Sequence, residues 1–251
     1  MIQDFSQVNE LSEFRARVID IHSKIDILVL NHAAIPLGPW TAFPNQQDPN
    51  FVLRVFNINV LSLIELTRLF LADLELSQGL IQVTGSLSGW LPHYEAGLYT
   101  ATKHAVNGFF YSLRQELEIK QSSVSLSVFS LGLIMTPEMD TLLSSEAAGQ
   151  EIPDFVKGDV EECGKVIVGA ALSRPRNVDY PPVLVKVVRF LSYVFPQAME
   201  MWSVSSVAGV GYSEVVQIHS RLHDLGDQIK YQVGNKKLGN KKVGNKKVGN
   251  K

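Results

Sequence analysis

The sequence has a single cysteine, Cys163, among 251 residues, and only 19% of its residues are charged. One cysteine excludes an internal disulfide framework and any zinc site built from several cysteines. No uninterrupted apolar run reaches the roughly 18 residues that a membrane-spanning helix needs. The N-terminal stretch is polar and carries acidic residues, unlike a signal peptide or a membrane anchor. As given, the sequence predicts no secretory route, which favours the cytoplasm, and at most a peripheral contact with membranes.

Positive charge is scarce in most of the chain and concentrated at its C-terminal end. Residues 232–251 hold seven lysines and no acidic residue, whereas the other 231 residues hold 16 basic and 25 acidic residues. Because such an acidic body offers no basic surface, we expect no nucleic-acid partner. The C-terminal end repeats (Val/Leu)-Gly-Asn-Lys-Lys, a composition that disfavours both helix and strand. We expect a disordered tail, which is either an electrostatic tether to anionic lipid or RNA, or a repeat without a role.

The rest of the chain, residues 1–231, is hydrophobic enough to bury a core as one large domain. Apolar periodicity predicts helices, and near-continuous apolar runs predict strands buried on both faces. This alternation of helix and strand predicts an α/β fold, a Rossmann-like doubly wound parallel sheet. In chain order, the expected elements are helix 8–24, strand 25–30, helix 51–76, strand 80–85, helix 97–119, strand 123–131, helix 159–172, an apolar stretch at 183–200 broken by Pro196, and helix 212–231.

The best candidates for catalytic chemistry are Tyr99 and Lys103, which stand four residues apart on one face of a predicted helix. A phenol with a pKa near 10 is a poor acid–base catalyst at neutral pH. A lysine cation about 4 Å away would favour the phenolate by about 4 kcal/mol at an effective dielectric near 20. Taken alone, the same spacing also fits a partly exposed helix face without a function.

Polar side chains follow the ends of all three predicted strands. Asn31 follows the first strand, Ser86 follows the second, and Thr136 lies just beyond the third. Because ligands of open α/β sheets bind at the carboxyl ends of the strands, we expect these residues to converge on one crevice. Asn59 has apolar neighbours, which favours a buried polar role. The serines do not fit Gly-x-Ser-x-Gly, because Leu87 occupies the central position, so a serine hydrolase is not favoured.

Together these residues make the sequence resemble the short-chain dehydrogenase/reductase family. Within that family it is most similar to the 11β-hydroxysteroid dehydrogenase type 1 group and its 1-like relatives, over roughly residues 1–200. The matching segments are Asn31-His32-Ala33-Ala34, Asn59, Ser86, Tyr99-x-x-x-Lys103 and Gly132-Leu133-Ile134-x-Thr136.

The resemblance implies an oxidoreductase that interconverts a hydroxyl and a carbonyl group on a lipophilic, steroid-like substrate, with NADP(H) in preference to NAD(H). Tyr99 would be the general acid or base, Ser86 would hydrogen-bond the substrate oxygen, and Asn59 would hold a water of the proton relay. Lys103 would hold the nicotinamide ribose and lower the pKa of Tyr99. The residues implied to line the dinucleotide are Asn31, His32, Ala33, Tyr99, Lys103, Ile134 and Thr136.

The resemblance also implies where the substrate and a partner subunit bind. The substrate-binding part would span about residues 137–231, with the loop 137–156 and the apolar segment 183–200 around the pocket. A homodimer would form through the helices 51–76 and 97–119. Members of this group are associated with the endoplasmic reticulum membrane through an N-terminal anchor.

Relative to the family, the sequence lacks the Thr-Gly-x-x-x-Gly-x-Gly loop that binds the cofactor phosphates at a helix N-terminus. Residue 1 corresponds to a position near the family's third strand, so three strands, two helices and the membrane anchor are expected to be absent. The strand 25–30 would then be an exposed apolar edge. Two explanations stay open: an incomplete product of a longer gene, or a truncated chain without cofactor that acts as a dimerisation partner.

Overall fold

The chain forms two units, residues 1–199 and 200–251, and the first contains all the strands in the part of the chain that the structure describes. The described part of the second unit is the C-terminal end of helix α8 (Pro196–Ala208). The predicted helix 212–231 and the lysine-rich tail lie outside the described residues, as does the predicted boundary between them. This structure, a computed structural model, describes residues 3–38, 40, 48–137, 139–141 and 156–208.

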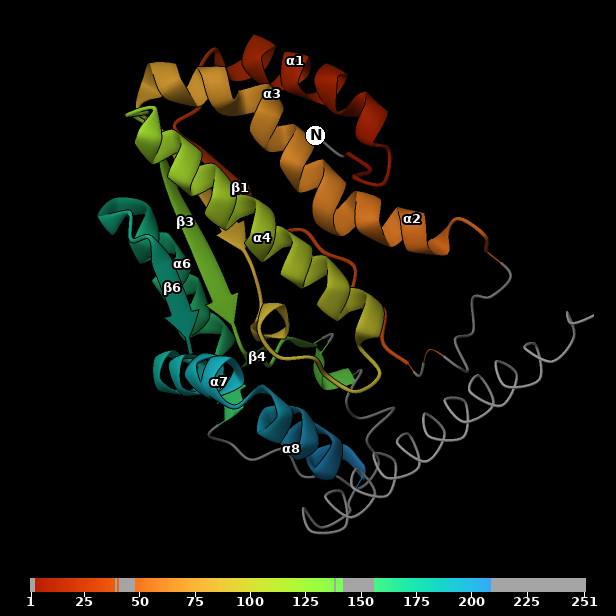
Figure 1. Cartoon of the computed structure of the whole chain (residues 1–251). Helices are drawn as coiled ribbons and strands as arrows, with labels where there is room; N and C mark the ends of the chain where they lie inside the picture. Colours follow the sequence, from red (N-terminus) through yellow and green to blue (C-terminus); the bar gives the residue numbers. More distant parts are fainter. Residues whose placement is uncertain (1–2, 39, 41–47, 138, 142–155, 209–251) are drawn as a thin grey trace, which may run out of the picture. The chain divides into compact units, whose positions relative to one another are not determined.

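A four-stranded parallel sheet with the strand order β1-β2-β3-β6 forms the centre of the first unit (Figure 1). Leu30 of β1 pairs with Val83 of β2, and Leu131 of β3 pairs with Tyr180 of β6. The parallel pairing places all the carboxyl ends at one edge of the sheet and confirms the predicted α/β fold. The strands are β1 (Ile27–Leu30), β2 (Leu80–Thr84), β3 (Ser125–Leu131) and β6 (Asn177–Tyr180).

Helices cover both faces of this sheet. Helices α1 (Leu11–His22), α3 (Ser62–Ser77) and α4 (Gly97–Ile119) pack on one face, and their inward side chains share one core with those of the strands. Helix α6 (Val160–Ser173) lies on the opposite face, where the Gln82 side chain donates a hydrogen bond to the Ile167 carbonyl oxygen. The buried residues of the main core are Leu11, Leu30, Val60, Leu63, Leu66, Phe70, Leu74, Ile81, Val83, Val106, Phe110, Leu117, Val124, Leu126 and Val128.

The predicted helix 51–76 is continuous but not uniform. It begins as α2 (Phe51–Phe56), passes through the π-helical segment η3 (Asn57–Leu61) and continues as α3. By length and composition Phe51–Ser77 could cross a membrane, a property that the search for uninterrupted apolar runs missed. In this structure 44% of its most apolar window is buried inside the protein.

Shorter elements complete the first unit. The 3-10 turns η1 (Val8–Glu10) and η4 (Leu87–Gly89) precede α1 and follow β2. Helix α7 (Pro182–Val194) ends just before Pro196 opens α8, which confirms the predicted break. The two-residue strands β4 (Leu133–Ile134) and β5 (Lys157–Gly158) pair with each other. A second apolar cluster joins η4 to α7, and it contains Leu87, Leu91, Leu184, Val188, Leu191 and Met199.

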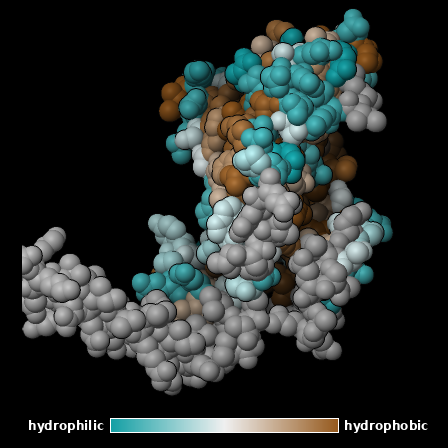
Figure 2. Space-filling view, turned by 90° about the vertical axis from the view of Figure 1, so that its right-hand side faces the viewer, coloured by the Kyte–Doolittle hydropathy of each residue, from teal (hydrophilic) through white to brown (hydrophobic). Residues whose placement is uncertain are grey.

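Within the described residues β1 is an edge strand, as predicted. Leu30 is 1% exposed in the core, but Ile27 and Val29 on the other face are 41% and 50% exposed. Hydrophobic side chains also remain visible between hydrophilic ones in Figure 2. At β1, therefore, Leu28 and Leu30 face the core, whereas Ile27 and Val29 lie on an exposed face.

Candidate active site

The strand ends bring together most of the predicted site residues. Asn31 follows β1, and its Oδ1 accepts a hydrogen bond of 2.7 Å from the Thr84 hydroxyl at the end of β2. The Lys103 ammonium, reaching across from α4, donates to the Thr84 carbonyl oxygen at 2.9 Å. Thr84 is thus the residue that joins β1, β2 and α4 at the carboxyl edge. Sequence reasoning missed it, although it directly precedes Gly85-Ser86.

Ser86, Tyr99 and Lys103 lie next to one another. The side chains of Ser86 and Tyr99 are hydrogen-bonded. The Lys103 Nζ lies 5.5 Å from the centroid of the Tyr99 ring, and Lys103 is only 3% exposed. The structure therefore places a phenol, a hydroxyl and a buried cation at one point, as the strand-end pattern predicts.

The pKa values in this site depend mainly on burial. Burial raises the pKa of Tyr99, and the hydrogen bond with Ser86 acts in the opposite direction. Burial lowers the pKa of Lys103 to about 8. The expectation that Lys103 lowers the pKa of Tyr99 is wrong for this structure, because the ammonium binds the Thr84 carbonyl oxygen rather than the phenol.

The Asn59 side chain, in the π-helical segment, forms hydrogen bonds with the loop after β1 and with α4. Its Oδ1 accepts from the Ala34 N–H at 2.7 Å, and its Nδ2 donates to the Ala34 carbonyl oxygen at 2.8 Å and to the Thr102 hydroxyl at 3.1 Å. Thr102 in turn donates to the Tyr99 carbonyl oxygen. Both amide N–H groups are therefore engaged, and the expectation that Asn59 holds a water of the proton relay stays a prediction. The side chain fixes the loop after β1 to the helix that carries Tyr99.

His32 is tied to the helix that follows the π-helical segment. Its Nε2 lies 2.7 Å from the Ser62 hydroxyl, and its ring stacks on Phe5 with a centroid distance of 3.8 Å. Because the Ser62 hydroxyl donates to the Ile58 carbonyl oxygen, it accepts from the His32 Nε2–H. Burial, aided by the Lys103 charge, lowers the pKa of His32 to about 4, so the ring is neutral at pH 7. No sequence pattern indicated the contact with Phe5.

The remaining predicted dinucleotide residues lie in two places. Ala33 is exposed, between His32 and Ala34, whose backbone is hydrogen-bonded to Asn59. Ile134 lies in β4 and is half-buried beside Gly158 of β5. The Thr136 hydroxyl accepts from the Met139 N–H at 3.2 Å. The structure thus connects Asn31 to Lys103 through Thr84, and Asn59 to Tyr99 through Thr102, with Ser86 beside Tyr99. Ile134 and Thr136 lie apart from this group, in β4 and just after it.

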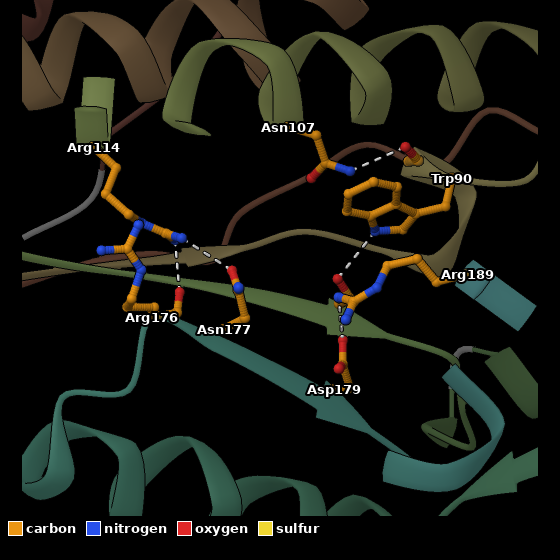
Figure 3. Close-up of polar contacts among 9 residues, drawn as sticks. Trp90, Asn107, Arg114, Arg176, Asn177, Asp179 and Arg189 are labelled. Carbon is orange, nitrogen blue, oxygen red and sulfur yellow. Dashed lines mark hydrogen bonds and ion pairs between the residues drawn. The ribbon is translucent and has the colours of Figure 1, made fainter. Parts of the chain in front are cut away.

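The turn after Ser86 is held by contacts that the sequence did not indicate (Figure 3). The Asn107 side chain donates to the Gly89 carbonyl oxygen at 3.0 Å, and the Trp90 indole donates to the Ser130 hydroxyl at 3.2 Å. The Arg189 guanidinium of α7 lies 5.4 Å from the centroid of the Trp90 ring and pairs with Asp179 at 2.9 Å. Helix α7 and strand β6 are therefore fixed to the turn that carries Ser86.

The predicted substrate segment is only partly described. Most of the loop 137–156 lies outside the described residues. Within the apolar segment 183–200, Val185 and Val188 of α7 are buried, whereas Phe190 is 63% exposed. One side of α7 thus packs in the apolar cluster with Leu87, the residue after Ser86, and the other side is exposed to solvent.

The site fits one half of a nicotinamide dinucleotide. The Lys103 ammonium has three N–H donors, and the described residues supply one hydrogen-bond acceptor, the Thr84 carbonyl oxygen. A buried cation with spare donors suits ribose hydroxyls, and the exposed Asn31 is connected to it through Thr84. For the phosphates the sequence offers no Gly-rich loop before β1.

Comparison with known proteins decides the family. The sequence model of the short chain dehydrogenases matches residues 2–147. The chain belongs to the short-chain dehydrogenase family. It is similar to hydroxysteroid 11-beta-dehydrogenase 1-like protein B of Xenopus laevis, with 33% identity over 62% of this chain and 51% of the relative. The Xenopus tropicalis 1-like protein is 30% identical over 78% of this chain and 65% of the relative. This short-chain dehydrogenase chain thus spans about half to two thirds of the length of these relatives.

A solved structure shows the same fold. The short chain dehydrogenase of Burkholderia cenocepacia in complex with NADP superimposes with a TM-score of 0.63 and 17% identity, over 80% of this chain and 76% of that one. The likeness supports a Rossmann-like architecture for the described sheet and helices.

Proposed function

We propose that this short-chain dehydrogenase chain carries the catalytic half of an NADP(H)-dependent oxidoreductase that interconverts a hydroxyl and a carbonyl group on a lipophilic, steroid-like substrate. The observation that carries the proposal is the placement of Ser86, Tyr99 and Lys103 together at the strand ends. The names of the relatives support a steroid-like substrate, and the NADP complex of the Burkholderia cenocepacia protein supports the cofactor.

The proposed chemistry needs a proton at Tyr99. Burial keeps the phenol protonated at neutral pH, which is the state that gives a proton to a carbonyl oxygen during reduction. In the reverse direction the phenolate takes the hydroxyl proton. The Ser86 hydroxyl, hydrogen-bonded to the phenol, would hold the substrate oxygen in line. The dinucleotide supplies or accepts the hydride.

Lys103 and Asn59 would position the cofactor and the loop beside it. The spare Lys103 donors would hold the nicotinamide ribose, next to Asn31 and Ala33, with Ile134 and Thr136 on the far side. Asn59 would keep the segment Asn31–Ala34 in place through its hydrogen bonds to Ala34. The proposal includes a Gly-rich phosphate loop that this sequence does not contain, as part of a longer protein.

A second candidate is a non-catalytic partner that dimerises through α2–α3 and α4. It is favoured by the missing phosphate loop and by apolar side chains left at the surface of these helices. Leu53 and Leu61 are 56% and 41% exposed, and Ile119 is 83% exposed. Such a homodimer is compatible with the first proposal, so only cofactor binding separates the two.

Titration of the purified chain with NADPH and NADH, followed by nicotinamide fluorescence and thermal shift, tests both candidates. The first predicts micromolar NADPH binding that is weakened in Lys103→Met and unchanged in Lys165→Met, an exposed lysine of α6. Tyr99→Phe should keep NADPH binding and lose the reduction of a steroid ketone.

Each other outcome has a defined meaning. A cooperative melt without NADPH binding, together with a dimer in analytical ultracentrifugation, would favour the partner. NADPH binding that survives Lys103→Met unchanged would refute the assigned ribose contact. A Tyr99→Phe variant that retains its reductase rate would refute the proton donor.

A further inference from the structure

A pocket lies at the opposite end of the sheet from Ser86 and Tyr99. It has a volume of about 200 Å³ and opens between the C-terminal end of α4 and the amino ends of β3 and β6. Glu118 supplies the one carboxylate among the lining residues that the structure describes, against three guanidinium groups. The lining residues are Arg114, Leu117, Glu118, Ser122, Val124, Ser125, Leu126, Arg174 and Arg176.

Arg114 lines this pocket, and Figure 3 shows its hydrogen bonds to Asn177 and Arg176. It is 6% exposed, and it donates to the Asn177 Oδ1 at 3.1 Å and to the Arg176 carbonyl oxygen at 2.6 Å. Both acceptors are neutral, and the buried Nε has no hydrogen-bond partner among the described residues. A buried guanidinium without a carboxylate partner is costly, and a nearby anion stabilises it.

Arg174 and Arg176 also line the pocket. Arg174 donates to the Gln78 carbonyl oxygen at 2.7 Å, another neutral acceptor. Arg176 pairs with Glu118, and the side chains of this pair are 63% and 50% exposed. A guanidinium has five N–H donors, so both side chains keep donors for a ligand. Two of the three cations therefore have only neutral hydrogen-bond acceptors among the described residues.

We propose that this pocket binds a phosphate group, either free or on a small organic molecule. Guanidinium groups suit the oxygens of phosphate in charge and in geometry, and the lining carries three guanidinium groups against one carboxylate. Leu117, Val124 and Leu126 give the pocket an apolar side that would contact an organic body. The cofactor of an open α/β sheet binds at the carboxyl edge, so this site at the amino edge is separate from the proposed active site.

Binding of inorganic phosphate to the full chain tests the proposal, by isothermal titration calorimetry and by thermal shift against chloride at equal ionic strength. The double variant Arg174→Gln/Arg176→Gln should bind phosphate about tenfold more weakly. Arg68→Gln is the matched control, because Arg68 forms the same kind of exposed pair with Glu65 on α3. It should leave phosphate binding unchanged.

Removal of the competing carboxylate tests the site from the other direction. Glu118→Gln frees Arg176 and should tighten phosphate binding several-fold, whereas Glu65→Gln makes the same change of charge elsewhere and should not. Phenyl phosphate distinguishes the two sources of the ligand. Tighter binding than inorganic phosphate would identify a phosphate ester, and equal binding would identify the free anion.

Two results would overturn the proposal. One is a thermal shift with phosphate no larger than that with chloride. The other is phosphate binding that survives in the arginine double variant but is lost in Lys103→Met, because the anion would then bind at the carboxyl edge. If the full chain binds phosphate at this pocket but does not bind NADPH, only the proposed function is refuted.

Discussion

The two edge strands of the sheet, β1 and β6, are held in different ways. Strand β6 is joined to helices by charged side chains: Asn177 accepts from Arg114 of α4, and Asp179, with its side chain 4% exposed, pairs with Arg189 of α7. Strand β1 is held on one face by apolar packing, and its other face leaves Val29 half exposed. Charged side chains thus join β6 to two helices, whereas the second face of β1 leaves an apolar surface exposed.

The largest expected effect concerns the two faces of β1. Leu30→Ala should lower the free energy of unfolding by about 2–5 kcal/mol, because Leu30 is buried in the main core. Val29→Ala, one residue away on the open face, should cost less than about 1 kcal/mol. Urea denaturation followed by circular dichroism measures both. Equal losses would show that a partner covers the open face in solution.

The next effect concerns the hydrogen bonds between Arg114 of α4 and residues 176 and 177 at the start of β6. Arg114→Leu should lower the free energy of unfolding by about 2–3 kcal/mol, because it removes two hydrogen bonds that a charged group donates, to the Asn177 side chain and to the Arg176 carbonyl oxygen. The exposed Arg176→Gln is the control and should cost at most about 1 kcal/mol. If both variants unfold at the same urea concentration, the buried hydrogen bonds of Arg114 do not hold this edge.

A smaller effect compares one ion pair at each edge. A double-mutant cycle with Asp179→Asn and Arg189→Met should give a coupling energy of about 1–2 kcal/mol, because Asp179 is buried. The pair Lys24–Asp26 just before β1 has both side chains more than 60% exposed, and its cycle should give less than about 0.5 kcal/mol. Similar coupling at both edges would remove the distinction drawn between them.

The last effect is a pH dependence at the end of β1. The pKa of His32 is about 4 in the folded chain, below its ordinary value of 6.5, so the unfolded state binds the proton more tightly. The unfolding free energy should therefore fall as the pH drops from about 6.5 towards 4. Melting temperatures across this range should fall less steeply in His32→Asn than in the parent chain, and the exposed His22→Gln should follow the parent. Parallel profiles for His32→Asn and the parent would contradict the prediction.

Much of the first unit could be predicted from the sequence, because its long elements carry strong patterns. The apolar runs at 25–30, 80–85 and 123–131 contain β1, β2 and β3, and the helices 97–119 and 159–172 agree with α4 and α6 within one residue. Strand β6 escaped prediction because Asn-Val-Asp-Tyr is short and polar, and its side-chain partners Arg114 and Arg189 lie elsewhere in the chain. Local patterns do not encode partners that lie so far along the chain.

The residues of the candidate site could be named from the sequence, but their hydrogen-bond partners could not. Lys103 was assigned to the site from its spacing to Tyr99, and a buried polar role for Asn59 was inferred from its apolar neighbours before the family resemblance gave both a function. Their actual acceptors, Ala34 and the Thr84 carbonyl oxygen, are set by tertiary packing. The same holds for the pKa of Tyr99, which burial raises and the hydrogen bond with Ser86 lowers, because both effects depend on tertiary packing.

The π-helical segment makes chain length itself a functional property. Deletion of one residue within Asn57–Leu61 would leave enough chain for a regular α-helix, yet it would rotate everything beyond the deletion by about 100°. Either Asn59 would lose Ala34, or the inward row that includes Leu63 and Phe70 would turn away from the sheet. The extra residue of the π-helical segment lets one helix both hold Ala34 through Asn59 and pack Leu63 and Phe70 against the sheet. At this position the number of residues therefore matters as much as their identity.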